Sequence, residues 1–216
     1  MHIDADSGAV SAALAELRAG VQGAGGGFRA DMTTVARGDA LWVTADGAET
    51  GDARLMAVPA ACLPALEPGW LELEAESFVL AAAPPAEPGA ARSARDALLT
   101  VYNACAKAAA WRTTTPWLTL ARDPALLDVL ARLRGGNPKA DGYRDLAARG
   151  AWNRLLVESF LGARLFRLQP GTGRGGADAE DADEAAPEAG EPVLMPFIDF
   201  LNHDFRARAY GMDTDA

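Results

Sequence analysis

Residues whose side chains could do chemistry stand together near position 200. Asp199, Asn202 and His203 lie at positions i, i+3 and i+4, so a single helical turn would place them on one face. They follow a short apolar run, residues 193–198. Polar groups on an otherwise apolar turn need hydrogen-bonding partners. The simplest interpretation is a capped turn in which Asp199 and Asn202 bond to nearby backbone groups. The alternative is a binding site.

A hydrolytic or metal site is another interpretation of the same stretch, with Asp199, His203 and Asp204 as its polar groups. Metal sites in proteins combine several nitrogen, sulfur or oxygen ligands. The only other histidine is His2, close to the first residue of the chain. The sequence therefore offers no second histidine cluster to complete such a site, and we predict no metal.

The string Pro196-x-x-Asp199-x-x-Asn202-His203 resembles the signature of SET-domain methyltransferases, in the branch similar to the Rubisco large-subunit methyltransferase. In that family the Asn and the His bind S-adenosylmethionine, largely through main-chain groups where the chain passes a knot-like crossing. The family usually has Ser after the His, whereas this chain has Asp204. The resemblance implies that Asp199, Asn202 and His203 bind the cofactor.

Glycines are dense in residues 23–27, which raises the question of a phosphate-binding loop. No Gly-Lys-Ser/Thr follows, and the Gly-x-Gly-x-x-Gly spacing is absent, so that interpretation fails. The pattern is instead similar to the opening of the SET family, where glycines let the backbone approach the cofactor without a Cβ in the way. The resemblance implies Gly25, Gly27 and, further along, the acidic Asp52 as cofactor-binding residues.

Residues 35–43 are typical of a β-hairpin, because Gly38 stands at a turn between β-rich runs. Arg37-Gly38-Asp39 also spells an adhesion tripeptide, but a tight turn explains these residues equally well. The SET family has a comparable glycine turn at this point. It usually has a proline where this chain has Thr44.

Arg164 lies at the end of a predicted helix over residues 152–165. A lone arginine at a helix end often lays its stem on the surface and keeps its charge in water. The segment around it, Gly162-Ala163-Arg164-Leu165-Phe166, resembles the Ser-Arg-x-Phe element of the SET family. There the arginine reaches the methionyl carboxylate of S-adenosylmethionine, a role that suits a guanidinium because it pairs with a carboxylate through two hydrogen bonds.

Composition limits the class of protein. The chain has 216 residues, half of them hydrophobic, which is enough for one sizeable core. It has no apolar run long enough to span a membrane and no apolar signal core at its start. Cys62 and Cys105 lack the close spacing of a zinc site or a disulfide framework, which fits reduced thiols. We expect a soluble cytoplasmic protein.

The formal net charge is −10, which argues against general affinity for nucleic acid or an anionic membrane. The charge is compatible with a protein substrate of basic character. Ordinary solubility explains it as well. We therefore predict a protein substrate, no nucleic acid and no membrane as partners.

We predict an α+β fold, an incomplete SET-type β-rich fold with a large helical insert. Helices are indicated at residues 8–19 and from a cap at Ser93 to about Ala109, and a further helix is capped by Asp123 with Pro124 at its start. Residues 70–76 alternate like a strand, whereas the family is usually helical there, so both remain open. The expected parts are residues 1–92 (N-terminal SET-like part), 93–167 (helical insert), 168–192 (acidic flexible loop) and 193–216 (start of the C-terminal SET part, truncated).

The resemblance implies a protein N-methyltransferase that moves a methyl group from S-adenosylmethionine to a lysine side chain. The family continues beyond the Asn-His string to a Tyr-Gly whose phenol frames the reacting amine. Tyr210-Gly211 follows His203 too closely to leave room for the intervening strand. We therefore expect a fragment with little activity of its own and name no catalytic residue. The alternative is a non-catalytic SET-like module for protein interaction.

Overall fold

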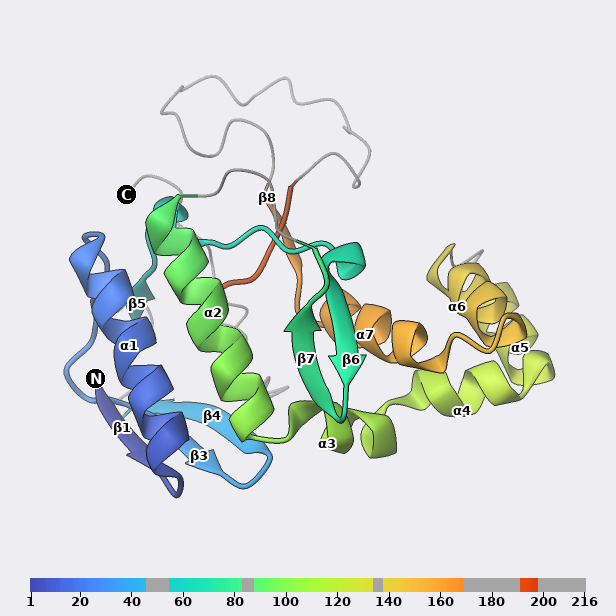
Figure 1. The fold of residues 1–216 in the computed structure, drawn as a ribbon, viewed down its shortest axis with the longest axis horizontal. Helices are drawn as coiled ribbons and strands as arrows, with labels where there is room; N and C mark the ends of the chain where they lie inside the picture. The colour runs from blue at the N-terminus through green and yellow to red at the C-terminus, as the bar shows by residue number, and fades with distance from the viewer. Residues whose placement is uncertain (46–54, 83–87, 134–137, 169–190, 198–216) are drawn as a thin grey trace. The chain divides into compact units, whose positions relative to one another are not determined.

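The structure, a computed structural model, describes residues 1–45, 55–82, 88–133, 138–168 and 191–197 (Figure 1). Helices and strands both contribute, which confirms the predicted α+β class. The chain forms two compact units. The first comprises Met1–Glu67, Pro84–Cys105 and Leu165–Ala216, and the second comprises Pro68–Ala83 and Ala106–Arg164. Four of the predicted site residues lie outside the described residues: Asp52, Asp199, Asn202 and His203. Most of the acidic segment and the end of the chain also lie outside them.

The first unit begins with a strand-helix-strand arrangement. Strand β1 (His2–Ala5) pairs in parallel with β3 (Met32–Arg37), and helix α1 (Gly8–Gly23) joins them. Parallel neighbours need such a crossover because a tight turn cannot connect them. The buried positions of α1 fall on one stripe, at helical spacing: Val10, Ala13, Leu14, Leu17 and Val21. The helix predicted at residues 8–19 is confirmed and continues one turn further.

The predicted hairpin at Gly38 is also confirmed. Strand β3 pairs antiparallel with β4 (Ala40–Ala45), and Gly38 adopts a φ of 55° in the turn between them. Arg37 donates from Nη2 to Asp4 Oδ2 at 2.6 Å, and the backbone N–H of Gly38 donates to Asp6 Oδ2 at 2.8 Å. Arg37 and Gly38 thus hold the hairpin against β1 and the start of α1, which is a structural explanation of the Arg-Gly-Asp tripeptide.

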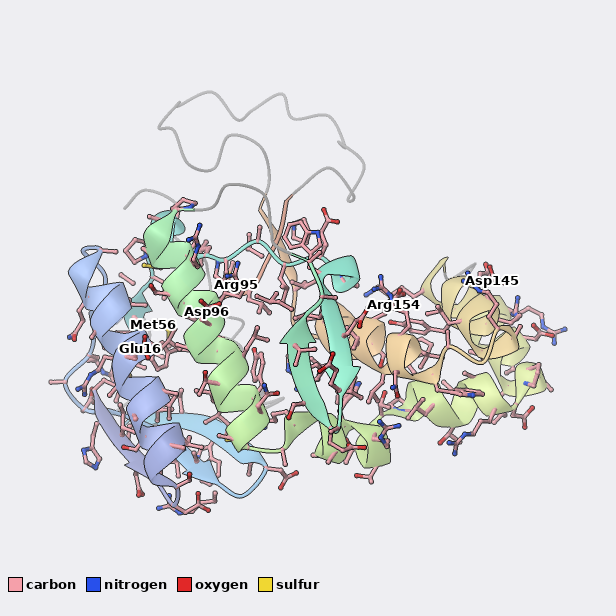
Figure 2. The ribbon with its side chains drawn as sticks, viewed as in Figure 1. Glu16, Met56, Arg95, Asp96, Asp145 and Arg154 are labelled. Atoms are coloured by element: carbon pink, nitrogen blue, oxygen red, sulfur yellow. The ribbon has the colours of Figure 1, made fainter. Side chains whose placement is uncertain are left out.

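Helix α2 (Gly89–Ala104) packs beside α1 (Figure 1). Arg95 of α2 is only 4% exposed, and its Nη2 lies 3.0 Å from Asp96 Oδ1 (Figure 2). The helix predicted from a cap at Ser93 to about Ala109 is wrong at both ends. Helix α2 begins at Gly89, so Ser93 lies within it, and it stops at Ala104; α3 (Lys107–Thr114) begins after Ala106, which has a φ of 47°. A left-handed residue cannot continue an α-helix, so one predicted helix becomes two.

Short strands complete the first unit. Strand β2 (Gly27–Phe28) pairs antiparallel with β5 (Met56–Ala57), and β8 (Phe166–Leu168) pairs antiparallel with β9 (Glu191–Val193). On the other side of β9, Ala65 forms a bridge to Val193, and the N–H of Leu194 donates to Pro64 O at 3.0 Å. The strand that leads into the Pro-x-x-Asp-x-x-Asn-His string is therefore held on both sides.

The second unit is built around α7 (Trp152–Gly162). Helix α7 packs against one strand and three helices: β6 (Leu71–Glu74), α3, α4 (Pro116–Arg122) and α6 (Pro138–Ala148). Its side chains Leu155, Leu156, Val157, Phe160 and Leu161 are buried. The strand alternative for residues 70–76 is the correct one, because β6 pairs with β7 (Ser77–Leu80) in an antiparallel hairpin. Leu71 and Leu73 are buried, whereas Glu72 and Glu74 are exposed.

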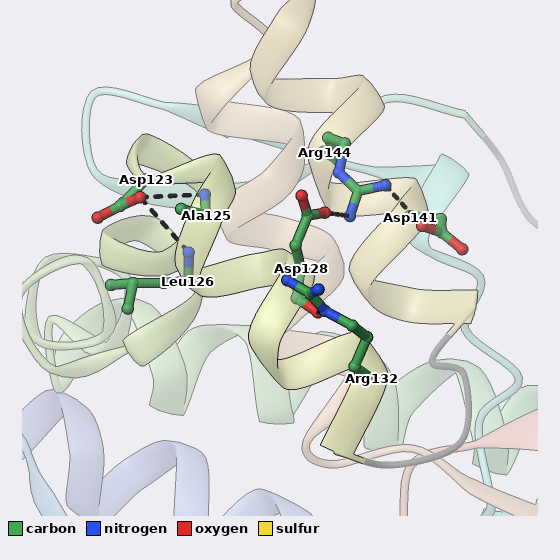
Figure 3. A network of polar contacts seen from close by, with 7 residues as sticks. All are labelled: Asp123, Ala125, Leu126, Asp128, Arg132, Asp141 and Arg144. Carbon is green, nitrogen blue, oxygen red and sulfur yellow. Dashed lines mark hydrogen bonds and ion pairs between the residues drawn. The ribbon is translucent and has the colours of Figure 1, made fainter.

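Helix α5 (Pro124–Leu133) begins as the sequence predicts. Asp123 Oδ1 accepts hydrogen bonds from the N–H groups of Ala125 at 3.1 Å and Leu126 at 3.4 Å, which is a helix N-cap (Figure 3). Arg144 of α6 lies between Asp128 of α5 and Asp141 of its own helix, at 2.7 and 2.9 Å (Figure 3). Both ion pairs are exposed, and the one between Arg144 and Asp128 joins α5 to α6. No helix in the described parts of the chain is long and apolar enough to cross a membrane.

Candidate cofactor-binding site

The glycine turn follows the end of α1. Gly25 has a φ of 91°, a conformation that favours glycine, and the N–H of Gly26 donates to Val21 O at 2.8 Å. A Cβ on Gly26 would lie 2.5 Å from Val21 Cγ1 and 2.6 Å from Ala57 O, so this position admits no side chain. The turn therefore needs glycine at 25 for its backbone conformation and at 26 for close packing.

Gly27 is different from its neighbours. It begins β2 and is paired with Ala57, yet a Cβ built on it would meet nothing within 4 Å. Neither a positive φ nor a close contact explains this glycine. Open space beside a strand backbone is what a ligand that approaches the main chain requires.

The residue after Gly27 connects the glycine turn to the C-terminal string. The ring of Phe28 lies 4.9 Å from that of Phe197, centroid to centroid, in an edge-to-face arrangement at 73°. Phe197 is 0% exposed, and the neighbouring Met195 is 4% exposed. The turn at Gly25–Gly27 and the start of the Pro-x-x-Asp-x-x-Asn-His string thus meet in the core of the first unit, although they lie at opposite ends of the sequence.

The backbone at Phe197 is strained. Its φ is 66°, which is rare for a bulky side chain and costs about 1–3 kcal/mol. Such a conformation persists when the surrounding structure enforces it, and here the burial of Phe197 does so. Pro196 and Phe197 form a turn shortly before Asp199, Asn202 and His203 in the sequence, and these three residues lie outside the described part. Asp52 also lies outside it.

Arg164 belongs to the second unit, just beyond the end of α7. Its Nη1 donates to Phe160 O at 3.2 Å. The guanidinium carbon lies 3.9 Å from the ring centroid of Phe160 and 5.1 Å from that of Trp111. The side chain is thus partly buried against aromatic faces and does not extend along the surface, as a simple snorkelling arginine would.

The sequence analysis did not predict the aromatic contact between Phe28 and Phe197 or the contact of Arg164 with Trp111. Phe28, Phe197 and Trp111 are apolar residues in apolar surroundings, and nothing in their spacing distinguishes them from ordinary core residues. The rings meet through tertiary contacts. Among the described residues, no group of three His, Cys, Asp or Glu side chains could hold a metal ion. The stretch of Asp199, His203 and Asp204 is not covered by that statement.

No family model, curated protein or solved structure matches this chain.

Proposed function

We propose that this chain binds S-adenosylmethionine and belongs to a SET-type protein methyltransferase that acts on a lysine side chain. The observation that carries the proposal is the contact between Phe28 and Phe197, because it joins the two segments in which the resemblance places most of the cofactor-binding residues. Those residues are Gly25 and Gly27 in the first segment and Asp199, Asn202 and His203 in the second; the resemblance adds Asp52 and Arg164 from other parts of the chain.

The chemistry of the described residues fits this cofactor. A Cβ at Gly27 would meet no described atom within 4 Å, which leaves room for a ligand beside this residue of β2. The guanidinium of Arg164 is a group that recognises a carboxylate through paired hydrogen bonds, and the resemblance assigns it to the methionyl carboxylate. Aromatic contacts restrict the guanidinium before any ligand arrives. When bound, S-adenosylmethionine supplies an electrophilic methyl group on a sulfonium.

The protein's part in such a reaction is to deliver a neutral amine. A lysine in water has a pKa near 10.4 and is mostly protonated at neutral pH, so its nitrogen has no lone pair for attack. A dry channel would disfavour the ammonium form and would hold the nitrogen in line with the methyl group that the cofactor would supply. Methyl transfer to that neutral amine would give a methylammonium group, which would then release a proton. A protein substrate of basic character suits the net charge of −10.

Calorimetric titration of the 216-residue chain with S-adenosylmethionine tests the proposal. Gly27→Ala is expected to weaken binding at least tenfold, about 1.4 kcal/mol, because the new Cβ fills the space that the ligand needs. Gly20→Ala is the matched control: it adds the same methyl group in the same unit, where a Cβ also meets nothing within 4 Å. That control should leave binding unchanged.

Thermal unfolding separates binding from folding. Gly27→Ala is expected to keep the midpoint of the wild type, since alanine is compatible with a strand and meets no atom. A folded wild type that binds no S-adenosylmethionine at millimolar concentration, or a Gly27→Ala variant that binds as well as the wild type, would contradict the proposal. The non-catalytic interaction module would then be the better interpretation.

A further inference from the structure

The guanidinium of Arg164 rests on two aromatic rings from different helices. Phe160 is one turn earlier on α7, and Trp111 is on α3. The distances from the guanidinium carbon, 3.9 Å to the Phe160 ring and 5.1 Å to the Trp111 ring, are those of cation–π contacts. Phe160 follows from the helix itself, because i and i+4 side chains meet on one face. The contact with Trp111 cannot follow from helix geometry, because Trp111 lies on a different helix.

The indole of Trp111 is held in place by its own contacts. Its Nε1–H donates to Ser159 Oγ at 2.9 Å, and the Ser159 hydroxyl donates to Leu156 O at 3.0 Å. Ser159 is 1% exposed, so these bonds are shielded from water. The indole also meets the Phe160 ring edge-to-face, at 6.0 Å and 83°. A buried serine therefore fixes the plane of the ring on which the arginine lies.

We propose that Trp111 is a positioning residue for Arg164, and that Ser159 acts through Trp111. The indole limits the guanidinium to one orientation, so that Arg164 meets a ligand carboxylate without first losing side-chain freedom. This inference rests on the proposed function, because the carboxylate is that of S-adenosylmethionine. It adds two residues that the family resemblance did not include.

Variants of Trp111 and Ser159 distinguish the effect of the indole ring on Arg164 from the effect of the hydrogen bond that holds the ring. Trp111→Leu removes the aromatic face and the indole N–H together. Trp111→Phe restores a face without the N–H, and Ser159→Ala keeps both rings but removes the acceptor. Trp152→Leu is the matched control, because Trp152 also carries an arginine over its ring, Arg122 at 5.7 Å, elsewhere in the same unit.

The ratio of the affinities for two ligands tests the positioning role, because a general loss of structure would weaken both ligands alike. S-adenosylmethionine has the carboxylate, whereas 5′-methylthioadenosine lacks it. Trp111→Leu is expected to weaken the binding of S-adenosylmethionine about fivefold or more and that of 5′-methylthioadenosine less than twofold. Trp111→Phe should recover part of the lost affinity. Ser159→Ala should show the same selectivity with a smaller effect, and Trp152→Leu should change neither. Equal weakening of both ligands by Trp111→Leu, or weakening of neither, would overturn the inference.

The same titrations distinguish this inference from the proposed function. If the wild type binds S-adenosylmethionine and Arg164→Ala weakens it while Trp111→Leu does not, only the role of Trp111 fails. If the wild type binds neither ligand, the proposed function fails. Proton NMR of the ligand-free protein then still tests the orientation of Arg164, whose δ protons should be shifted upfield by ring currents. A shift that persists unchanged in Trp111→Leu would show that the indole does not position the arginine.

Discussion

The ring of Phe197 stands edge-on to the ring of Phe28, with 4.9 Å between their centroids. Phe28 follows the glycine turn directly, and Phe197 follows the proline that opens the Asp-x-x-Asn-His string. Hydrogen bonds hold the backbone at or near each phenylalanine: β2 pairs with β5 at Phe28, and a bridge and a hydrogen bond hold residues 193–194, shortly before Phe197. The pair therefore brings the residue after the glycine turn into contact with the residue after Pro196, although the two are far apart in the sequence.

Phe197→Ala is expected to lower the free energy of unfolding by about 3–5 kcal/mol, since it empties a fully buried site. Phe28→Ala should have a smaller effect because Phe28 is only partly buried. A double-mutant cycle in urea is expected to give a coupling of about 0.5–1.5 kcal/mol between the two rings. Strict additivity would show that the edge-to-face contact contributes nothing beyond burial.

Gly26→Ala is expected to destabilise the first unit by about 1–3 kcal/mol or more, as overpacking does in a tight core. The new Cβ would lie 2.6 Å from a backbone oxygen, Ala57 O, and 2.7 Å from Pro59 Cδ, neither of which can move alone. Gly20→Ala should instead stabilise the protein by about 0.5–1 kcal/mol, because alanine is the better helix former. Urea unfolding of both variants checks this. If Gly26→Ala unfolds at the wild-type urea concentration, the close packing of the turn is wrong.

Local features of the fold could be predicted from the sequence, and distant ones could not. The apolar stripe of α1, the turn at Gly38 and the cap at Asp123 each depend on residues within one or two turns of each other. The end of α2 could not be predicted. Alanine and lysine at positions 104 and 106–108 are good helix formers, so these residues give no local signal of the left-handed conformation at Ala106.

The candidate site follows the same rule. Its polar residues and glycines can be recognised because their types and spacing are unusual. Its aromatic contacts cannot, because Trp111 and Ser159 are 48 residues apart and each alone is typical of a core helix. The glycines show the limit of the motif as well: the resemblance names Gly25 and Gly27 and gives Gly26 no role, whereas in the structure Gly26 is the one whose position leaves no room for a Cβ.

Tyr143 is expected to make the protein less stable at high pH. Burial raises the pKa of Tyr143 from 10.0 to about 12, and the nearby carboxylate of Glu158 adds to the effect. Between these two values the unfolded chain has lost the phenolic proton while the folded chain retains it, so stability falls as pH rises. The full difference corresponds to about 2–3 kcal/mol.

Urea unfolding at pH 9 and pH 11.5 checks this expectation. Tyr143→Phe removes the titrating group and keeps the ring that packs on Trp117 at 4.8 Å. The loss of stability between the two pH values should therefore be smaller in Tyr143→Phe than in the wild type. Equal losses in the two proteins would show that the phenol of Tyr143 titrates normally.

The turn between β6 and β7 offers a stabilising change. Ala75 and Glu76 have φ values of 44° and 69°, so both adopt a left-handed conformation that favours asparagine and glycine in two-residue hairpin turns. An ion pair explains the glutamate at position 76, because its Oε1 lies 3.3 Å from Arg112 Nη2 on α3. Nothing comparable explains Ala75.

Ala75→Asn is accordingly expected to raise the free energy of unfolding by about 0.5–1 kcal/mol, since asparagine tolerates this conformation at lower cost. Ala75→Val is the opposing control: a β-branched residue is strained there and should lower stability by more than asparagine raises it. Both changes leave the pair of Glu76 and Arg112 in place. Urea unfolding of the two variants should therefore give shifts of opposite sign. If valine is tolerated as well as asparagine, the left-handed conformation at Ala75 is not what the protein adopts in solution.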